Sequence, residues 1–158
     1  MGCRNDDESL DLVNYRGEID MGYRSEVGYV LTFPSKVKRE EFVAVAKLKG
    51  GEFESAVSEL EDYQFNKRIN SDALMVGNFG LRFHEHSIKW YDHFEDVKAH
   101  HTLMRMCAND AFRGVYQFIR IGEEDGDIAR EEGQHESFEQ EFSSRLHTTH
   151  PEIVFEDW

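Results

Sequence analysis

The chain of 158 residues carries 32 Asp and Glu against 18 Lys and Arg, which gives a formal net charge of −14 at pH 7. An acidic field of this size repels nucleic acid and anionic membranes, which argues against direct binding to either. With 39% hydrophobic residues, 13% aromatic residues and two prolines, the composition predicts a folded domain and excludes a disordered acidic chain.

The first 20 residues are acidic and nearly free of pattern, so we expect a flexible acidic N-terminal extension over 1–20. Residues 1–10 lack the basic and apolar regions of a signal peptide, and no apolar run reaches the length of a membrane helix. Cys3 and Cys107 make no disulfide framework, and Cys107 lies among apolar residues that predict a buried thiol. These features predict a cytoplasmic protein.

The core is predicted to open with a strand and two helices. Residues 26–33 alternate in a way that favours a strand with both faces at least partly covered. Ser35 predicts the N-cap of a helix that ends at a Gly-Gly pair, and a second short helix follows up to about Asp62. Four residues are expected to form the apolar face of the first helix: Phe42, Val45, Ala46 and Leu48.

The next segment is predicted to contain a loop and a β-hairpin. Residues 63–72 are polar and are expected to form a loop. Residues 73–76 and 81–89 predict two strands, and Gly and Asn between them supply the chemistry of a turn over 77–80.

A third helix and a second hairpin are expected to complete the core. Asp92 and Glu95 predict a capping box for the helix, and His101 falls on its apolar face as an expected core residue. Residues 115–121 predict an apolar strand, followed by a turn and an antiparallel return over 127–132. The tail from 133 to 158 is expected to be an acidic extension that packs on the core. Its apolar residues over 138–146 fit either a helix or an alternating strand, and the neighbouring Ser and Thr residues favour the strand.

The predicted order from 27 to 121 is strand, helix, strand, strand, helix, strand. This order predicts an α+β protein with a ferredoxin-like split βαββαβ antiparallel sheet and helices on one face. We expect a core domain over 21–132 between the two acidic extensions.

Three histidines are candidate metal ligands: His84, His86 and His93. Two imidazoles two residues apart lie on one face of a strand and, with a third ligand, can hold zinc. Because no cysteine lies at ligand spacing and no His-Glu-x-x-His motif occurs, we expect structural or surface histidines and no metal or other cofactor. This set remains the basis of a metal-dependent enzyme as a third hypothesis.

The chain contains no nucleophile elbow and no phosphate-binding loop, so we predict no enzyme and no catalytic residues. Basic residues gather once, on the first helix. Such a cluster could instead bind a small anionic ligand, and a protein that sequesters a nucleotide signal is the alternative hypothesis. The basic residues in question are Lys36, Lys38, Arg39, Lys47 and Lys49.

Acidic residues are concentrated near the end of the chain, where residues 122–158 hold twelve Asp and Glu against two Arg. Duplex DNA carries one charge per about 1.7 Å of axis, and carboxylates at every second residue of a strand repeat at about 6.8 Å. Such an array can imitate a phosphate row and occupy a basic groove on another protein. The residues expected to do so are Glu123, Glu124, Asp125, Asp127, Glu131, Glu132, Glu136, Glu139 and Glu141. Possible aromatic anchors beside them are Tyr116, Phe118, Phe138 and Trp158.

Three segments resemble a family of small acidic proteins encoded by tailed phages and prophages: MGYRSEV over 21–27, IKWYDHFEDVKAH over 88–100 and YQFIRIGEEDGDI over 116–128. The resemblance covers roughly 21–132 and implies no known activity, so no catalytic residues are carried over. It implies a viral protein that acts on its bacterial host. We therefore expect a non-enzymatic inhibitor of the anti-CRISPR or anti-restriction type, acting as a monomer or dimer in the host cytoplasm on a protein complex with a basic groove.

Overall fold

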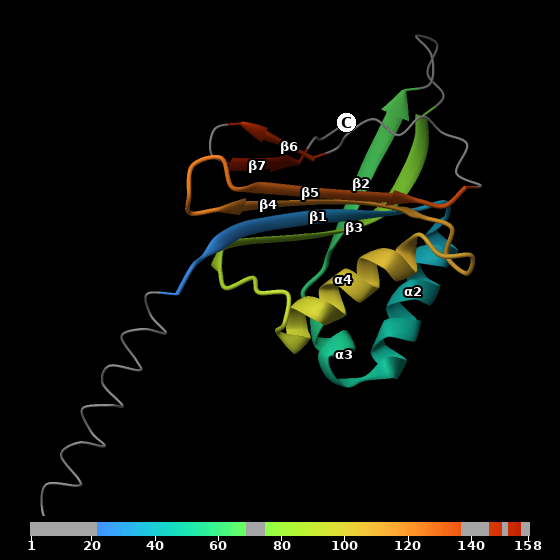
Figure 1. Ribbon diagram of the computed structural model, residues 1–158. Helices are drawn as coiled ribbons and strands as arrows, with labels where there is room; N and C mark the ends of the chain where they lie inside the picture. The colour runs from blue at the N-terminus through green and yellow to red at the C-terminus, as the bar shows by residue number, and fades with distance from the viewer. Residues whose placement is uncertain (1–21, 69–74, 137–145, 150–151, 156–158) are drawn as a thin grey trace, which may run out of the picture.

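The computed structural model describes residues 22–68, 75–136, 146–149 and 152–155 (Figure 1). Over these residues a five-stranded antiparallel sheet carries helices on one face, and a two-stranded sheet lies on the other. The predicted α+β class is confirmed. The expected N-terminal extension, 1–20, lies outside the described residues, as does most of the strand expected in the tail.

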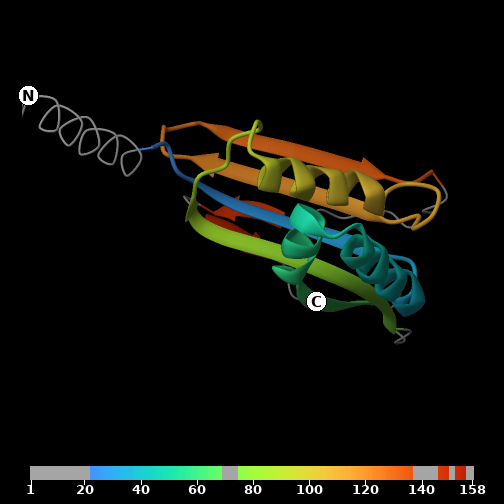
Figure 2. The same cartoon turned by 90° about the horizontal axis from the view of Figure 1, so that it is seen from below.

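The elements follow in the order β1 (Ser25–Phe33), α2 (Lys36–Lys49), α3 (Gly51–Ser58), β2 (Glu61–Arg68), β3 (Met75–Ile88), α4 (Glu95–Cys107), β4 (Val115–Gly122), β5 (Ile128–Gln134), β6 (Leu146–Thr149) and β7 (Glu152–Phe155). The large sheet has the order β2-β3-β1-β4-β5, and each pair of neighbours is antiparallel. Figure 2 shows α4 in front of the β4–β5 half of this sheet and α2 and α3 in front of the other half. Strand β1 lies in the middle, so every residue of it except Glu26 is buried.

The start of α2 is as predicted, because the Ser35 hydroxyl accepts a hydrogen bond from the Lys38 backbone N–H at 3.2 Å. Its apolar face is narrower than predicted. Phe42 and Ala46 are fully buried, whereas Leu48 is 86% exposed and Val45 is 36% exposed. The buried stripe continues through Arg39, and Leu48 is about 200° around the helix from Ala46.

The predicted loop over 63–72 and the predicted turn over 77–80 are wrong. Strand β2 occupies most of the first segment, and β3 runs without a break through the second. Tyr63 pairs with Gly80, and Asn66 pairs with Gly77. Pairing with a neighbouring strand outweighs the local turn preference of Gly and Asn, since strand formation depends on cross-strand contacts more than on intrinsic propensity.

Helix α4 begins at Glu95 with Phe94 at the N-cap position and without a side-chain cap, so the predicted capping box is wrong. The buried histidine of this helix is His100, which is 3% exposed, and not the predicted His101. The Tyr29 hydroxyl and His100 Nδ1 lie 2.6 Å apart inside the core. Cys107 is fully buried as predicted, and burial raises the pKa of its thiol.

The face of the sheet opposite the helices is covered in part by the hairpin of β6 and β7 (Figure 1). Ile153 of β7 is 4% exposed and packs with Val30, Tyr63 and Ile119 in a second, smaller core. This hairpin therefore brings the C-terminal part of the chain next to β1 and β4. No helix in the described part of the chain is long and apolar enough to cross a membrane.

Candidate functional site

The acidic residues of the β4–β5 hairpin do not form one row along the strand. Successive side chains of a strand point to opposite faces, so Glu131 lies on the helix side of β5 and Glu132 on the other side. Glu131 accepts a hydrogen bond from the Tyr116 hydroxyl at 2.8 Å, and Glu132 accepts one from the Gln117 amide at 3.1 Å. Glu139 and Glu141, which were expected to extend the row, lie outside the described residues.

The turn between β4 and β5 carries three consecutive exposed acids, which we call the acidic tip: Glu123, Glu124 and Asp125. Two residues that precede β1 hold the tip in position. The Arg24 backbone N–H donates to Glu123 Oε1 at 2.9 Å, and the Glu124 backbone N–H donates to the Tyr23 hydroxyl at 3.2 Å. The tip is therefore presented to solvent from a fixed base.

Asp127, which follows the tip, is paired with side chains of the same chain. Both of its carboxylate oxygens accept hydrogen bonds from the Arg120 guanidinium, at 2.9 and 3.0 Å, and the Tyr23 hydroxyl donates to one of them. The hydrogen bonds from Arg120 and then Tyr23 lower the pKa of Asp127 below its ordinary value. Asp127 therefore closes the hairpin and adds no free charge to the surface.

Two of the four expected aromatic anchors do not project from the surface toward a partner protein. Tyr116 and Phe118 are 6% and 5% exposed and belong to the core between the sheet and the helices. Burial, followed by the hydrogen bond to Glu131, raises the pKa of Tyr116 to about 12. The prediction that Tyr116 and Phe118 act as anchors is wrong, because the side chains of these two β4 residues lie on the helix side of the sheet. Phe138 and Trp158 lie outside the described residues.

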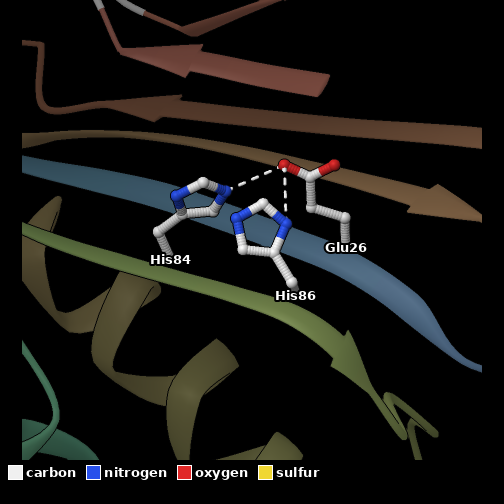
Figure 3. A group of neighbouring side chains, drawn as sticks. All are labelled: Glu26, His84 and His86. Atoms are coloured by element: carbon white, nitrogen blue, oxygen red, sulfur yellow. Dashed lines mark hydrogen bonds and ion pairs between the residues drawn. The ribbon is translucent and has the colours of Figure 1, made fainter. Parts of the chain in front are cut away.

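Two of the three candidate histidines meet at one place, on the face of the sheet away from the helices. His84 Nε2 lies 2.8 Å from Glu26 Oε1, and His86 Nδ1 lies 3.6 Å from the same oxygen. Both imidazoles turn toward the carboxylate (Figure 3). His93 is exposed and contacts the rings of Tyr91 and Phe94 instead, so it does not join the other two histidines.

Glu26 reaches both histidines because of two local features of the sheet. Gly28 is the cross-strand partner of His84, so no side chain on β1 blocks the space in front of that imidazole. Farther along, Val27 pairs with Glu85 but Ser25 pairs with Ile88, which puts one extra residue into β3. Ser87 takes up this bulge with a φ of 58°, and the Arg24 guanidinium donates to its carbonyl at 2.8 Å.

Glu26 is the residue that the sequence analysis missed. It is one of many acids in the chain, and only the alternation of β1 could have placed it on the face opposite Val27. Its side chain is 12% exposed, whereas those of His84 and His86 are 28% and 66% exposed. The backbone N–H of Ile153 on β7 donates to Glu26 Oε1 at 3.0 Å and fixes the carboxylate.

A pocket of about 430 Å³ lies between α4 and the β4–β5 hairpin. Trp90 and Phe118 form its aromatic wall, and the Trp90 indole nitrogen is buried without a hydrogen-bond partner in the described part of the chain. Burial lowers the pKa of His101, which favours the neutral imidazole there. The charged residues of the wall are Lys98, Arg105, Arg120, Asp92 and Glu131.

The basic residues of α2 do not gather around one pocket, although Lys49 at the end of the helix lines a hollow of about 310 Å³ beside α4. Lys36 and Lys38 lie within 3.9 and 3.3 Å of Glu40 and Glu41 one turn farther along the helix. Arg39 is 7% exposed and turns inward, where its guanidinium lies 3.6 Å from an Asp62 carboxylate oxygen. The basic cluster is therefore explained as a solvent-exposed helix face whose charges pair with acidic residues of the same chain.

Comparison of the chain with models of known protein families, with curated proteins and with solved structures finds no match. The candidate sites therefore rest on the geometry of the chain itself.

Proposed function

We propose that the protein is a phage-encoded, non-enzymatic inhibitor that binds a bacterial nucleic-acid-handling or defence complex, of the anti-CRISPR or anti-restriction type. The proposal rests on the acidic tip at the end of the β4–β5 hairpin. Residues 122–136 hold seven Asp and Glu against one Arg, and Asp127 is paired with Arg120 of β4. The partner is a bacterial protein complex with a basic groove, in the cytoplasm of the host.

The rigid base of the tip supports this function. A carboxylate on a mobile loop loses conformational entropy when it binds. The tip loses less, because Arg24 holds the Glu123 carboxylate and the Tyr23 hydroxyl holds the Glu124 backbone. Fixed negative charges also steer a basic partner during diffusional encounter, which raises the association rate by about 10- to 1,000-fold at low salt. The resemblance to tailed-phage proteins supports a bacterial defence complex as the target.

The proposed fold is the ferredoxin-like split βαββαβ, with β5 added at one edge and an acidic C-terminal extension packed on the core. The order β2-β3-β1-β4, with antiparallel neighbours, supports this assignment. So do the two connections through helices, one from β1 to β2 and one from β3 to β4. The buried Ile153 supports the packing of the extension.

Removing the charge of the tip should weaken inhibition. The triple variant Glu123→Gln/Glu124→Gln/Asp125→Asn keeps Asp127 and therefore the ion pair that closes the hairpin. We expect its association rate with the inhibited nuclease to fall at least about tenfold at low salt, because steering depends on these charges. The measurement is DNA cleavage by a panel of purified CRISPR and restriction nucleases, followed by binding kinetics at low and high salt on the inhibited complex.

The control is Glu40→Gln/Glu52→Gln/Glu54→Gln, which removes the same number of charges from exposed positions on α2 and α3. It should leave the association rate within about twofold of the parent value, because screened charges far from the contact steer weakly. Equal losses in both triple variants, or binding that does not change with salt, would contradict a specific role of the tip. Failure to inhibit any nuclease of the panel would contradict the inhibitor function itself.

The pocket beside α4 favours a second candidate, a protein that sequesters a small nucleotide signal. An aromatic wall suits a base, and the cations of Arg105 and Lys98 suit a phosphate. We expect a cyclic oligonucleotide of the right size to raise the melting temperature, and Arg105→Ala, at an exposed position, to abolish the shift. Lys36→Ala on α2 is the matched control and should retain it. A screen without any shift would contradict this candidate.

A further inference from the structure

We propose that Glu26, His84 and His86 form a binding site for one divalent transition-metal ion of the zinc class. The site is independent of the acidic tip and of the proposed inhibition. It joins two neighbouring strands of the sheet, since Glu26 belongs to β1 and both histidines belong to β3 (Figure 3).

The distances between the three ligand atoms suit a tetrahedral ion. Zinc binds imidazole nitrogen and carboxylate oxygen at about 2.0–2.1 Å, so neighbouring ligand atoms of a tetrahedron lie about 3.3 Å apart. The two distances from Glu26 Oε1, 2.8 Å to His84 and 3.6 Å to His86, lie on either side of that value. All three ligand atoms lie within 4.8 Å of one another. Small side-chain rotations are therefore enough to close the site around an ion.

The ligand types select the class of ion. Two imidazole nitrogens and one carboxylate oxygen suit zinc and its first-row neighbours, whereas magnesium and calcium prefer oxygen ligands alone. Three protein ligands leave a fourth position for water or another ligand. This position opens to solvent, because the His86 side chain is 66% exposed.

The hydrogen bond from the Ile153 N–H to Glu26 Oε1 serves as the outer contact that orients a metal-binding carboxylate. It also links the site to the hairpin of β6 and β7, because Ile153 is buried against the sheet. An ion at this site thus links β1 and β3 directly and β7 through the hydrogen bond to Glu26, and its binding favours the folded state by mass action.

The test is a zinc titration of the full chain without a histidine tag, in which a chelating dye competes for the ion. We expect one zinc ion per chain, and no competition from an excess of magnesium. Changing an outer contact of a metal site costs about 10- to 100-fold in affinity, so loss of a direct ligand should cost at least about 100-fold. This loss is expected for Glu26→Gln, His84→Ala and His86→Ala alike.

His93→Ala is the matched control, since His93 is exposed and does not belong to the group of ligand atoms formed by Glu26, His84 and His86. It should bind zinc as tightly as the parent chain. His86→Ala is the safest of the ligand variants, because the side chain is mostly exposed, and its melting temperature in chelator should equal that of the parent. Cobalt gives a second readout, because a tetrahedral cobalt spectrum should appear in the parent and in His93→Ala and be absent from His86→Ala.

Three results would overturn the proposal. One is a parent chain that takes up no zinc while it is folded. The second is zinc binding that survives in the double variant His84→Ala/His86→Ala, which would assign the ion to other residues. The third is a loss of affinity in His93→Ala as large as that in His86→Ala.

Discussion

Replacing Phe42 with Ala is expected to lower the free energy of unfolding by about 3–5 kcal/mol, as for other large aromatic residues removed from a close-packed core. Phe42 is fully buried where α2 meets the sheet. Its ring lies 4.9 Å from that of Phe33 and 5.3 Å from that of Phe112, measured between ring centres. The cavity left by the substitution cannot be filled by these rigid neighbours. Urea unfolding followed by circular dichroism measures the loss.

Leu48→Ala on the same helix is the matched control. Both residues belong to the apolar face that the sequence predicted, but Leu48 is 86% exposed. The free energy of unfolding should therefore change by no more than about 0.5 kcal/mol. Similar losses in the two variants would mean that Leu48 is covered in solution and would contradict the packing of α2 described above.

Acid is expected to destabilise the fold through His100. Burial lowers the pKa of this imidazole from its ordinary value of 6.5 to about 4. The unfolded chain therefore binds a proton at a higher pH than the folded chain, so the free energy of unfolding falls as the pH falls from about 6.5 toward 4. Linkage gives a loss of about 2 kcal/mol between pH 8 and pH 5 from this group alone.

The groups around His100 explain why burial dominates. Tyr29 offers its hydroxyl to Nδ1, and burial also raises the pKa of that hydroxyl, so it stays protonated. Asp96 raises the pKa of His100 and His101 lowers it, but both effects are smaller than that of burial. The Glu59 carboxylate lies 3.7 Å from Nε2, yet its side chain is half exposed and water screens it.

The experiment compares urea unfolding of the parent and of His100→Gln at pH 8, 6 and 5. Gln keeps an acceptor for the Tyr29 hydroxyl but does not titrate. The parent should lose about 2 kcal/mol more than the variant over this range. Contributions from groups that do not contact His100 are shared by the two proteins and cancel in the comparison. Parallel pH profiles would show that His100 is not held neutral.

The sequence by itself determined the elements whose pattern is local. The alternation in β1 and the apolar run of β4 each predict a strand, since both faces of these strands are buried. Ser35 predicts the start of α2, because a hydroxyl at an N-cap needs no distant residue to act. The acidic turn before β5 was equally local, since Gly and acidic side chains favour turns.

Segments whose structure depends on a distant partner were predicted wrongly. The polar residues of β2 favour a loop, and the Gly and Asn at 77–80 of β3 favour a turn, although strands were predicted on either side of that turn. Both segments are strands because β2 and β3 pair with each other and β3 also pairs with β1. In α4, the choice of His100 over His101 for the core depends on where Tyr29 of β1 lies. The hydrophobic periodicity of the sequence does not distinguish between two adjacent helix positions such as 100 and 101.

The candidate sites divide in the same way. The sequence determined that the chain is strongly acidic and that His84 and His86 share a face of a strand. Only the tertiary structure decided that Glu26 is their third neighbour, since the register between β1 and β3 is set by backbone hydrogen bonds and by the bulge at Ser87. It also decided which acids remain exposed, because Arg120 and Tyr23 reach Asp127 but leave the tip to solvent.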